Sequence, residues 1–165
     1  CKDIINFVGK ALKQRKYFIA LVKDFKIMKL KNIPTGNSKE DIKTRERIIS
    51  DFYYEWKRSN PTQRLFNIDL KDYINIRHIS IIETVEHAAR TYLSTLAVLQ
   101  LDSILTMAKK VRIVNVKPKD KNQNQFEKMI KMEYELVGIG KVSLIVGVKR
   151  SNKEKIQYCI TAIKI

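Results

Sequence analysis

Apolar and polar residues alternate over the last third of the chain, in four segments separated by polar residues. The segments span residues 111–116, 130–136, 142–148 and 156–162, and turns that contain Gly or Asn separate the last three. A period of two broken by such turns is typical of antiparallel hairpins. The pattern therefore predicts an antiparallel sheet of four strands.

Apolar residues spaced three or four apart predict helices before this sheet. Residues 3–22 are predicted to form an amphipathic basic helix, and residues 25–30 either continue it or form a short strand. A further helix is predicted to begin after Ser38, with Asp41 completing a capping box, and to end before Pro61. Its predicted buried stripe consists of Ile42, Ile49, Phe52, Tyr53 and Trp56.

The middle of the chain is predicted to contain a connecting segment over residues 62–77 and then a second helical block. That block begins at the capping box Ser80–Glu83 and continues in pieces as far as Lys110. Helices followed by a sheet predict an α+β fold, with the helices packed on one face of the four-stranded antiparallel sheet. We expect a helical N-terminal region (1–77) and a helix-plus-sheet domain (78–165).

The chain is strongly basic, with 33 Lys and Arg against 17 Asp and Glu, a net charge of +16 and a pI of about 9.9. Such an excess favours nucleic acid or another anionic partner and does not bear on the fold. A Lys- and Ile-rich codon bias is the alternative origin of this composition. No run of 18 apolar residues occurs, so we expect a cytoplasmic protein without a membrane partner.

The sequence lacks the patterns of metal and cofactor sites. The only histidines are His78 and His87, and no Cys-x-x-Cys occurs, so no metal or cofactor is predicted. Cys159 lies in an apolar strand and is predicted to be a core thiol, while Cys1 at the first position suggests a chain trimmed from something longer. His87 lies among apolar helix residues and is predicted to be structural.

Two basic segments are candidates for nucleic-acid binding. The loop between the first two strands carries lysines and amides that can contact phosphates and splayed bases, and the first helix presents cations on one side. A solvated loop and a solvated helix face are the alternatives. The candidate residues are Lys10, Lys13, Arg15 and Lys16 in the helix and Lys119, Lys121 and Asn122 in the loop.

A ribonuclease that works without a metal needs cations for the phosphate, a base for the 2′-hydroxyl and an acid for the leaving oxygen. Lys117 and Lys149 are the candidate cations, and His78 or Tyr158 is the candidate for proton transfer. The alternatives are that Tyr158, like Tyr134, belongs to the core, and that His78 is a structural hydrogen-bond donor.

The last strands resemble a known family. Residues 141–148 and 158–163 are similar to the last two strands of barnase–EndoU–RelE-like ribonuclease domains, which occur in bacterial toxins and in polyvalent proteins of phages and other mobile elements. The closing Ile-Thr-Ala resembles their Val-Thr-Ala-Tyr strand, and residues 117–122 are similar to a His-Pro-Asn-Asp-Lys-Asn loop of some members. The resemblance covers residues 78–165. It implies RNA as the substrate and places Thr161 at the active site, where it orients phosphate.

The chain departs from this family at two positions. Ile163 stands where the toxins often have Tyr or Phe, and Lys117 stands where some members have His.

Our first hypothesis is an RNA-directed domain that acts as a metal-independent endoribonuclease on tRNA or another structured RNA. The alternative is a non-catalytic accessory module that binds nucleic acid or a protein partner, with an acidic inhibitor protein as a further partner of a toxin.

Overall fold

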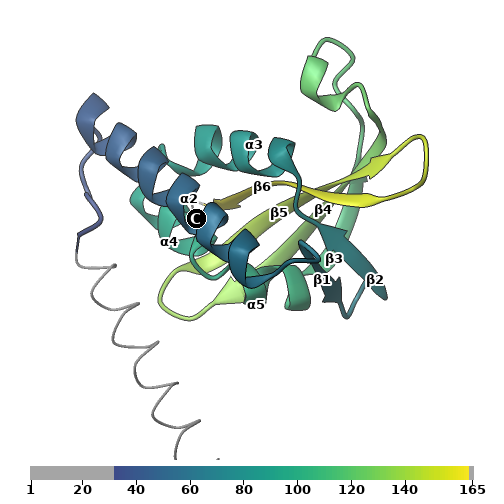
Figure 1. The fold of residues 1–165 in the computed structure, drawn as a ribbon, viewed down its shortest axis with the longest axis horizontal. Coiled ribbons are helices and arrows are strands. Elements are labelled where there is room, and N and C mark those ends of the chain that lie inside the picture. The colour runs from purple at the N-terminus through teal and green to yellow at the C-terminus, as the bar shows by residue number, and fades with distance from the viewer. Residues whose placement is uncertain (1–31, 164–165) are drawn as a thin grey trace, which may run out of the picture. The chain divides into compact units, whose positions relative to one another are not determined.

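The structure is a computed structural model that describes residues 32–163 (Figure 1). The described residues from Pro34 onward form one compact unit, and the division at residue 77 stays a prediction. The predicted basic helix over residues 3–22, with Lys10, Lys13, Arg15 and Lys16, lies outside the described residues.

Helices and strands follow one another in an order that confirms the α+β class. The sheet has six strands in the order β1-β2-β6-β5-β4-β3, in which β2 and β6 run parallel and all other neighbours run antiparallel (Figure 1). The elements are α2 (Lys39–Ser59), β1 (Arg64–Asn67), β2 (Asp72–Asn75), α3 (His78–Ala88), α4 (Tyr92–Val98), α5 (Leu101–Met107), β3 (Lys109–Val114), the 3-10 turn η1 (Lys121–Gln123), β4 (Phe126–Leu136), β5 (Gly140–Lys149) and β6 (Lys155–Ala162).

The prediction of four antiparallel strands is confirmed for those four and incomplete for the sheet, which has two further strands and one parallel pair. The four predicted strands correspond to β3–β6, which are adjacent and antiparallel. The segment predicted to be a connection forms the β1–β2 hairpin, which adds to the edge of the sheet through the parallel pair β2–β6. Each of these strands has four residues, of which Leu65 and Ile74 oppose one another and face the core. A strand that short does not contain enough alternation to be recognised from its pattern.

The second helical block also differs from the prediction at both ends. It begins at His78, and Ser80 is its third residue, whose hydroxyl accepts a hydrogen bond from the Arg77 N–H at 3.0 Å. It ends at Met107, and β3 begins at Lys109. Lys109 and Lys110 belong to the sheet because they pair with Glu133 and Met132 of β4, and the Lys110 N–H donates to the Asp69 side chain at 2.8 Å.

Helix α2 begins as predicted and has one unexpected buried residue. The capping box is present, with the Asp41 N–H donating to the Ser38 hydroxyl at 3.1 Å. The predicted stripe is buried at Ile49, Tyr53 and Trp56. Arg45 is also completely buried.

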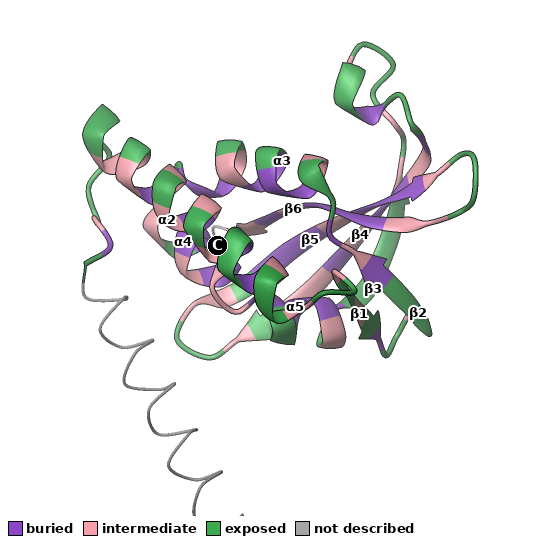
Figure 2. Cartoon of the chain, in the orientation of Figure 1, coloured by how far each residue is buried: buried purple, intermediate pink, exposed green. Residues whose placement is uncertain are grey.

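The main core lies between the helices and one face of the sheet (Figure 2). A buried polar network connects helices α2 and α3 to strand β6. In this network the hydroxyl of Tyr53 on α2 donates to Oε1 of Gln157 on β6 at 2.8 Å. The Gln157 amide donates in turn to the Thr84 hydroxyl at 2.7 Å. This network fixes the position of α3 beside the sheet. Core residues from the two layers include Ile49, Leu101, Ile104, Met132, Leu144 and Ile160.

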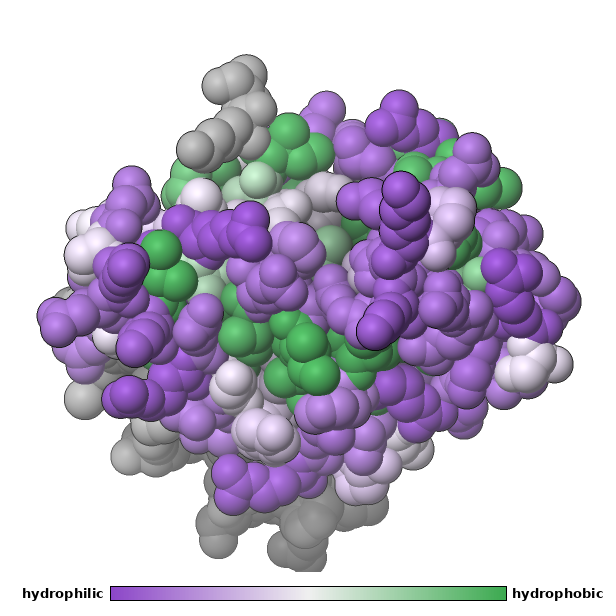
Figure 3. Space-filling view, turned by 90° about the horizontal axis from the view of Figure 1, so that it is seen from above, coloured by the Kyte–Doolittle hydropathy of each residue, from purple (hydrophilic) through white to green (hydrophobic). Residues whose placement is uncertain are grey.

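The opposite face of the sheet carries a smaller apolar cluster and more polar residues. The cluster consists of Phe126, Met129, Ile156 and Tyr158. Viewed from above Figure 1, the molecule is mostly hydrophilic, with a group of apolar residues near the centre and smaller groups toward the top and the upper right (Figure 3). This view shows no extended apolar surface of the kind that marks a large protein interface. Among residues 32–163, no helix has the length and apolar character needed to cross a membrane.

Candidate functional site

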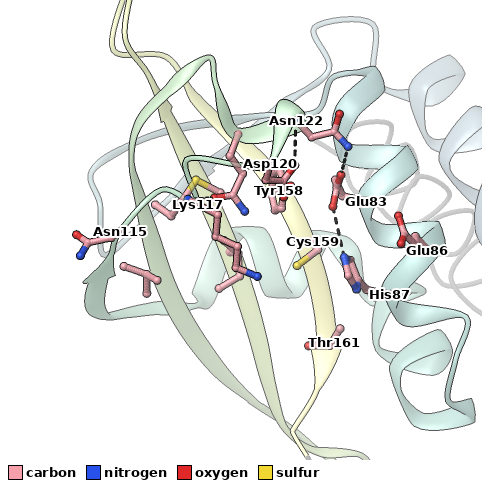
Figure 4. A pocket seen from close by; sticks show the side chains of 14 residues that line it. Glu83, Glu86, His87, Asn115, Lys117, Asp120, Asn122, Tyr158, Cys159 and Thr161 are labelled. Carbon is pink, nitrogen blue, oxygen red and sulfur yellow. Dashed lines mark hydrogen bonds and ion pairs between the residues drawn. The ribbon is translucent and has the colours of Figure 1, made fainter.

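A pocket of about 560 Å³ lies between α3, the β3–β4 connection and the sheet (Figure 4). Three structural elements supply most of its polar groups. Helix α3 contributes Glu83, Glu86 and His87, strand β6 contributes Tyr158, Cys159 and Thr161, and the β3–β4 connection contributes Asn115, Lys117, Asp120 and Asn122.

The α3 side of the pocket follows from helical spacing. Glu83, Glu86 and His87 are three and four residues apart and therefore share one face of the helix. The Glu83 side chain is only 5% exposed, and its Oε2 lies 3.4 Å from His87 Nε2. Its other oxygen accepts a hydrogen bond from the Asn122 amide. The buried carboxylate therefore links the helix to the β3–β4 connection (Figure 4).

The β6 side of the pocket depends on an irregularity in the strand. Cys159 pairs with Ile145 and Gln157 pairs with Val146, so Tyr158 is an extra residue with no partner in β5. Such a bulge re-aims the side chains around it. Tyr158 and Cys159 consequently both line the pocket, although neighbouring residues of a regular strand point to opposite faces.

Burial keeps both of these side chains protonated. Burial raises the pKa of Tyr158 well above its ordinary value, and the charges of Glu83 and Asp120 raise it further. The Tyr158 hydroxyl lies 3.4 Å from Asp120 Oδ2, to which it donates. Burial is also the main cause that raises the pKa of Cys159 to about 12. At neutral pH the thiol is therefore not a nucleophile.

Hydrogen bonds within the β3–β4 connection hold Lys117 at the pocket. The Lys117 N–H donates to Gln123 Oε1 at 2.8 Å, and Asp120 caps η1 by accepting from the Asn122 N–H at 2.9 Å. The Lys117 side chain extends over the sheet toward β6 (Figure 4). Its charge acts on the Cys159 thiol, whose pKa it lowers slightly against the larger effect of burial. Within residues 32–163, the Lys117 ammonium has no ion-pair partner.

The structure brings four of the candidate site residues together and leaves others apart. Lys117, Asn122, Tyr158 and Thr161 line the pocket. The remaining candidates among the described residues do not line it: His78 is the exposed first residue of α3, Lys149 ends β5, and Lys119 and Lys121 are exposed in the β3–β4 connection.

Several pocket residues were not singled out from the sequence as site residues. Glu83, Glu86 and Asp120 were not candidates, and His87 and Cys159 were assigned structural roles. The spacing Glu83, Glu86, His87 was the available signal. It did not stand out, because charged residues at this spacing are also typical of a solvated helix face.

The donor atoms on α3 are close enough to hold a metal ion. The ligand atoms of Glu83, Glu86 and His87 lie within 4.8 Å of one another, and imidazole with carboxylates suits several divalent cations. Both carboxylates already have protein partners, because Glu83 binds Asn122 and Glu86 lies 3.6 Å from Arg90. Side-chain contacts alone therefore account for these acidic groups.

No protein-family model, curated protein or solved structure matches the chain. The resemblance to barnase–EndoU–RelE-like domains therefore depends on its short motifs alone. Any statement about function must be argued from the pocket itself.

Proposed function

We propose that this domain is an RNA-directed, metal-independent endoribonuclease whose active site is the pocket between α3 and β6. The observation that carries the proposal is the grouping of His87 with Lys117 and Thr161 in one pocket, with His87 held by a buried carboxylate. In this proposal these groups supply the base and the cation that cleavage by an adjacent 2′-hydroxyl requires, together with a donor that orients the phosphate, and water serves as the acid for the leaving oxygen.

His87 is the general base in this proposal. The Glu83 carboxylate faces Nε2 and favours the tautomer that carries its proton there, which leaves the Nδ1 lone pair free to accept one. In the Ser-His-Asp triad an acidic side chain orients the catalytic imidazole in the same way, although it binds Nδ1 there and leaves Nε2 as the base. The His87 side chain is 40% exposed, so substrate can reach it. His87 thus takes the role that the sequence hypothesis gave to His78 or Tyr158.

Lys117 and Thr161 bind the reacting phosphate. The ammonium of Lys117 is unpaired among the described side chains, and it opposes the charge that accumulates on the phosphate oxygens during attack. The 2′-oxygen gives its proton to His87 and bonds to phosphorus, and the 5′-oxygen leaves and is protonated by water. The products are a cyclic phosphate and a 5′-hydroxyl end. Lys149 has no part in this scheme, because it lies outside the pocket.

The charge and the motifs of the chain support RNA as the substrate. A net charge of +16 attracts a polyanion without sequence preference. The resemblance of residues 141–148 and 158–163 to ribonuclease strands points in the same direction, and its threonine, Thr161, lines the pocket.

The deciding experiment is incubation of the full chain with total tRNA in EDTA. Cleavage is expected, and an RNA with 2′-O-methyl groups is expected to stay intact. The His87→Gln variant should be slower by about 10²- to 10⁴-fold. The His78→Gln variant is the matched control and should retain the native rate.

Two further results bear on the proposal. The Lys117→Ala variant should lose about 10²- to 10³-fold in rate, whereas Lys43→Ala, an exposed lysine on α2, should lose none. Intact RNA at high protein concentration, with binding that weakens steeply with salt, would favour the non-catalytic binding module instead.

A further inference from the structure

The β1–β2 hairpin exposes two aromatic rings that meet edge to face and a guanidinium that lies over one of them. Phe66 and Tyr73 are directly opposite in the hairpin register, and their ring centroids are 5.5 Å apart at an interplanar angle of 76°. The guanidinium carbon of Arg64 lies 4.1 Å from the centroid of the Tyr73 ring. Phe66 is 46% exposed and Tyr73 is 42% exposed. We call these three residues the aromatic platform.

Strand register places the aromatic platform on the same face of the sheet as the pocket. Tyr73 and Asn75 are two residues apart in β2 and therefore share a face. Asn75 pairs with Ile156 in β6, and Ile156 belongs to the same apolar cluster as Tyr158. Since Tyr158 lines the pocket, one face of the sheet carries both features.

Cross-strand aromatic pairs also stabilise hairpins, so exposure alone does not indicate a ligand. The charge of Arg64 is the observation that does. The Arg64 guanidinium has no ion-pair partner among residues 32–163, although Lys155 beside the hairpin is paired with Asp72. An unpaired planar cation stacked on an exposed ring presents both a charge for phosphate and flat surfaces for bases.

We propose that the aromatic platform binds unpaired bases of a single-stranded RNA segment whose backbone continues to the pocket. The proposal rests on RNA being the ligand, as argued above, and it specifies the substrate class. Bases stack on aromatic rings and guanidinium planes only when they are not paired, so a loop or an unpaired strand fits and a continuous duplex does not. Stacking tolerates any base, so the platform selects strandedness rather than sequence.

The test uses the full chain and oligoribonucleotides that contain 2-aminopurine, a base whose fluorescence changes when it stacks. Titration of a single-stranded oligonucleotide is expected to quench the probe, and the matched duplex is expected to bind more weakly. The double variant Phe66→Val, Tyr73→Val keeps residues that favour strands, and it should bind roughly five- to a hundredfold more weakly. The matched control is Tyr54→Val, which removes a 53%-exposed tyrosine from α2 and should not change binding.

Separate variants distinguish stacking from a loss of folding. Arg64→Lys keeps the charge and removes the guanidinium plane, so it should weaken binding without changing the salt dependence. Tyr73→Trp should bind the oligonucleotide as the native chain does, since tryptophan also stacks on bases. Native affinity and quenching in a folded Phe66→Val, Tyr73→Val variant would overturn the inference while leaving the proposed function intact. Quenching without any cleavage would leave the inference intact and overturn the ribonuclease proposal.

Discussion

Nε2 of His87 lies 3.4 Å from the buried Oε2 of Glu83, and the other oxygen of that carboxylate holds Asn122. A single buried acidic group therefore positions one residue of the helix and one residue of the β3–β4 connection. The two sides of the pocket are linked at this point.

Under the proposed ribonuclease function, in which Glu83 positions His87 as the base, we predict that Glu83→Gln lowers kcat by at least about tenfold while KM changes little. Glutamine keeps the size of the side chain and an oxygen for Asn122, so the melting temperature should stay close to native. The control is Glu86→Gln, which removes an exposed carboxylate of the same helix face. Equal kcat for Glu83→Gln and the native chain would contradict the positioning role.

We predict that Cys159 reacts slowly with iodoacetamide at pH 8, because burial raises its pKa to about 12 and the thiolate is the reactive form. Peptide mapping after alkylation separates its label from that of Cys1, and the unfolded chain in denaturant provides the reference rate. The raised pKa of Cys159 also makes the stability of the fold depend on pH. A thiol with a raised pKa in the folded state contributes stability below its unfolded pKa, and this contribution is lost as the pH rises toward about 12. Rapid labelling of the folded chain at pH 8 would contradict this account.

Much of the fold could be predicted from local patterns, and the exceptions have a common cause. The strands β4, β5 and β6 contain eight or more residues each, so their alternation is repeated often enough to be recognised. The capping box at Ser38 and Asp41 is likewise local. The hairpin β1–β2 has four residues in each strand and joins the sheet through two residue pairs with β6, Ile74–Lys155 and Asn75–Ile156. Its formation depends on tertiary packing, which the sequence pattern does not contain.

The same reasoning applies to the pocket. Lys117 and Thr161 could be picked out because a lysine-rich loop and a closing-strand motif are visible as short segments. His87 could not be picked out, because its contact with a buried carboxylate depends on Glu83 being covered by the β3–β4 connection, which is a tertiary feature. The bulge that turns Cys159 into the pocket is also invisible, since the apolar alternation of β6 continues across it.

We predict that Gly147→Ala destabilises the chain by about 1–3 kcal/mol, as overpacking of a filled core does. A Cβ at this position would approach the ring of Phe126 to 2.6 Å, and Phe126 is completely buried. Urea unfolding monitored by circular dichroism measures the change. The contrasting variant is Gly138→Ala, where a Cβ meets nothing and only the positive φ of 82° resists substitution. If Gly147→Ala unfolds at the native urea concentration, the ring of Phe126 has space to move.

We predict that Arg45→Lys destabilises the chain by at least about 2 kcal/mol, although the charge is retained. The buried guanidinium donates to the carbonyl oxygens of Ala89 at 2.7 Å, Pro34 at 2.9 Å and Gly36 at 2.6 Å. Nε binds Ala89 and Nη1 binds Pro34 and Gly36, so the guanidinium joins the segment before α2 to the residue that follows α3. A lysine ammonium on a single flexible stem cannot reproduce this planar fork, and each buried carbonyl left without a donor costs about 1–3 kcal/mol.

The control for this variant is Arg47→Lys, two residues further along α2 at a position that is not fully buried. It should unfold at nearly the native urea concentration. Hydrogen exchange provides a second measurement, because loss of the fork should first weaken protection at the end of α3, near Ala89. Equal stability of Arg45→Lys and Arg47→Lys would show that the three carbonyls find other donors, and that charge rather than geometry keeps an arginine in this buried position.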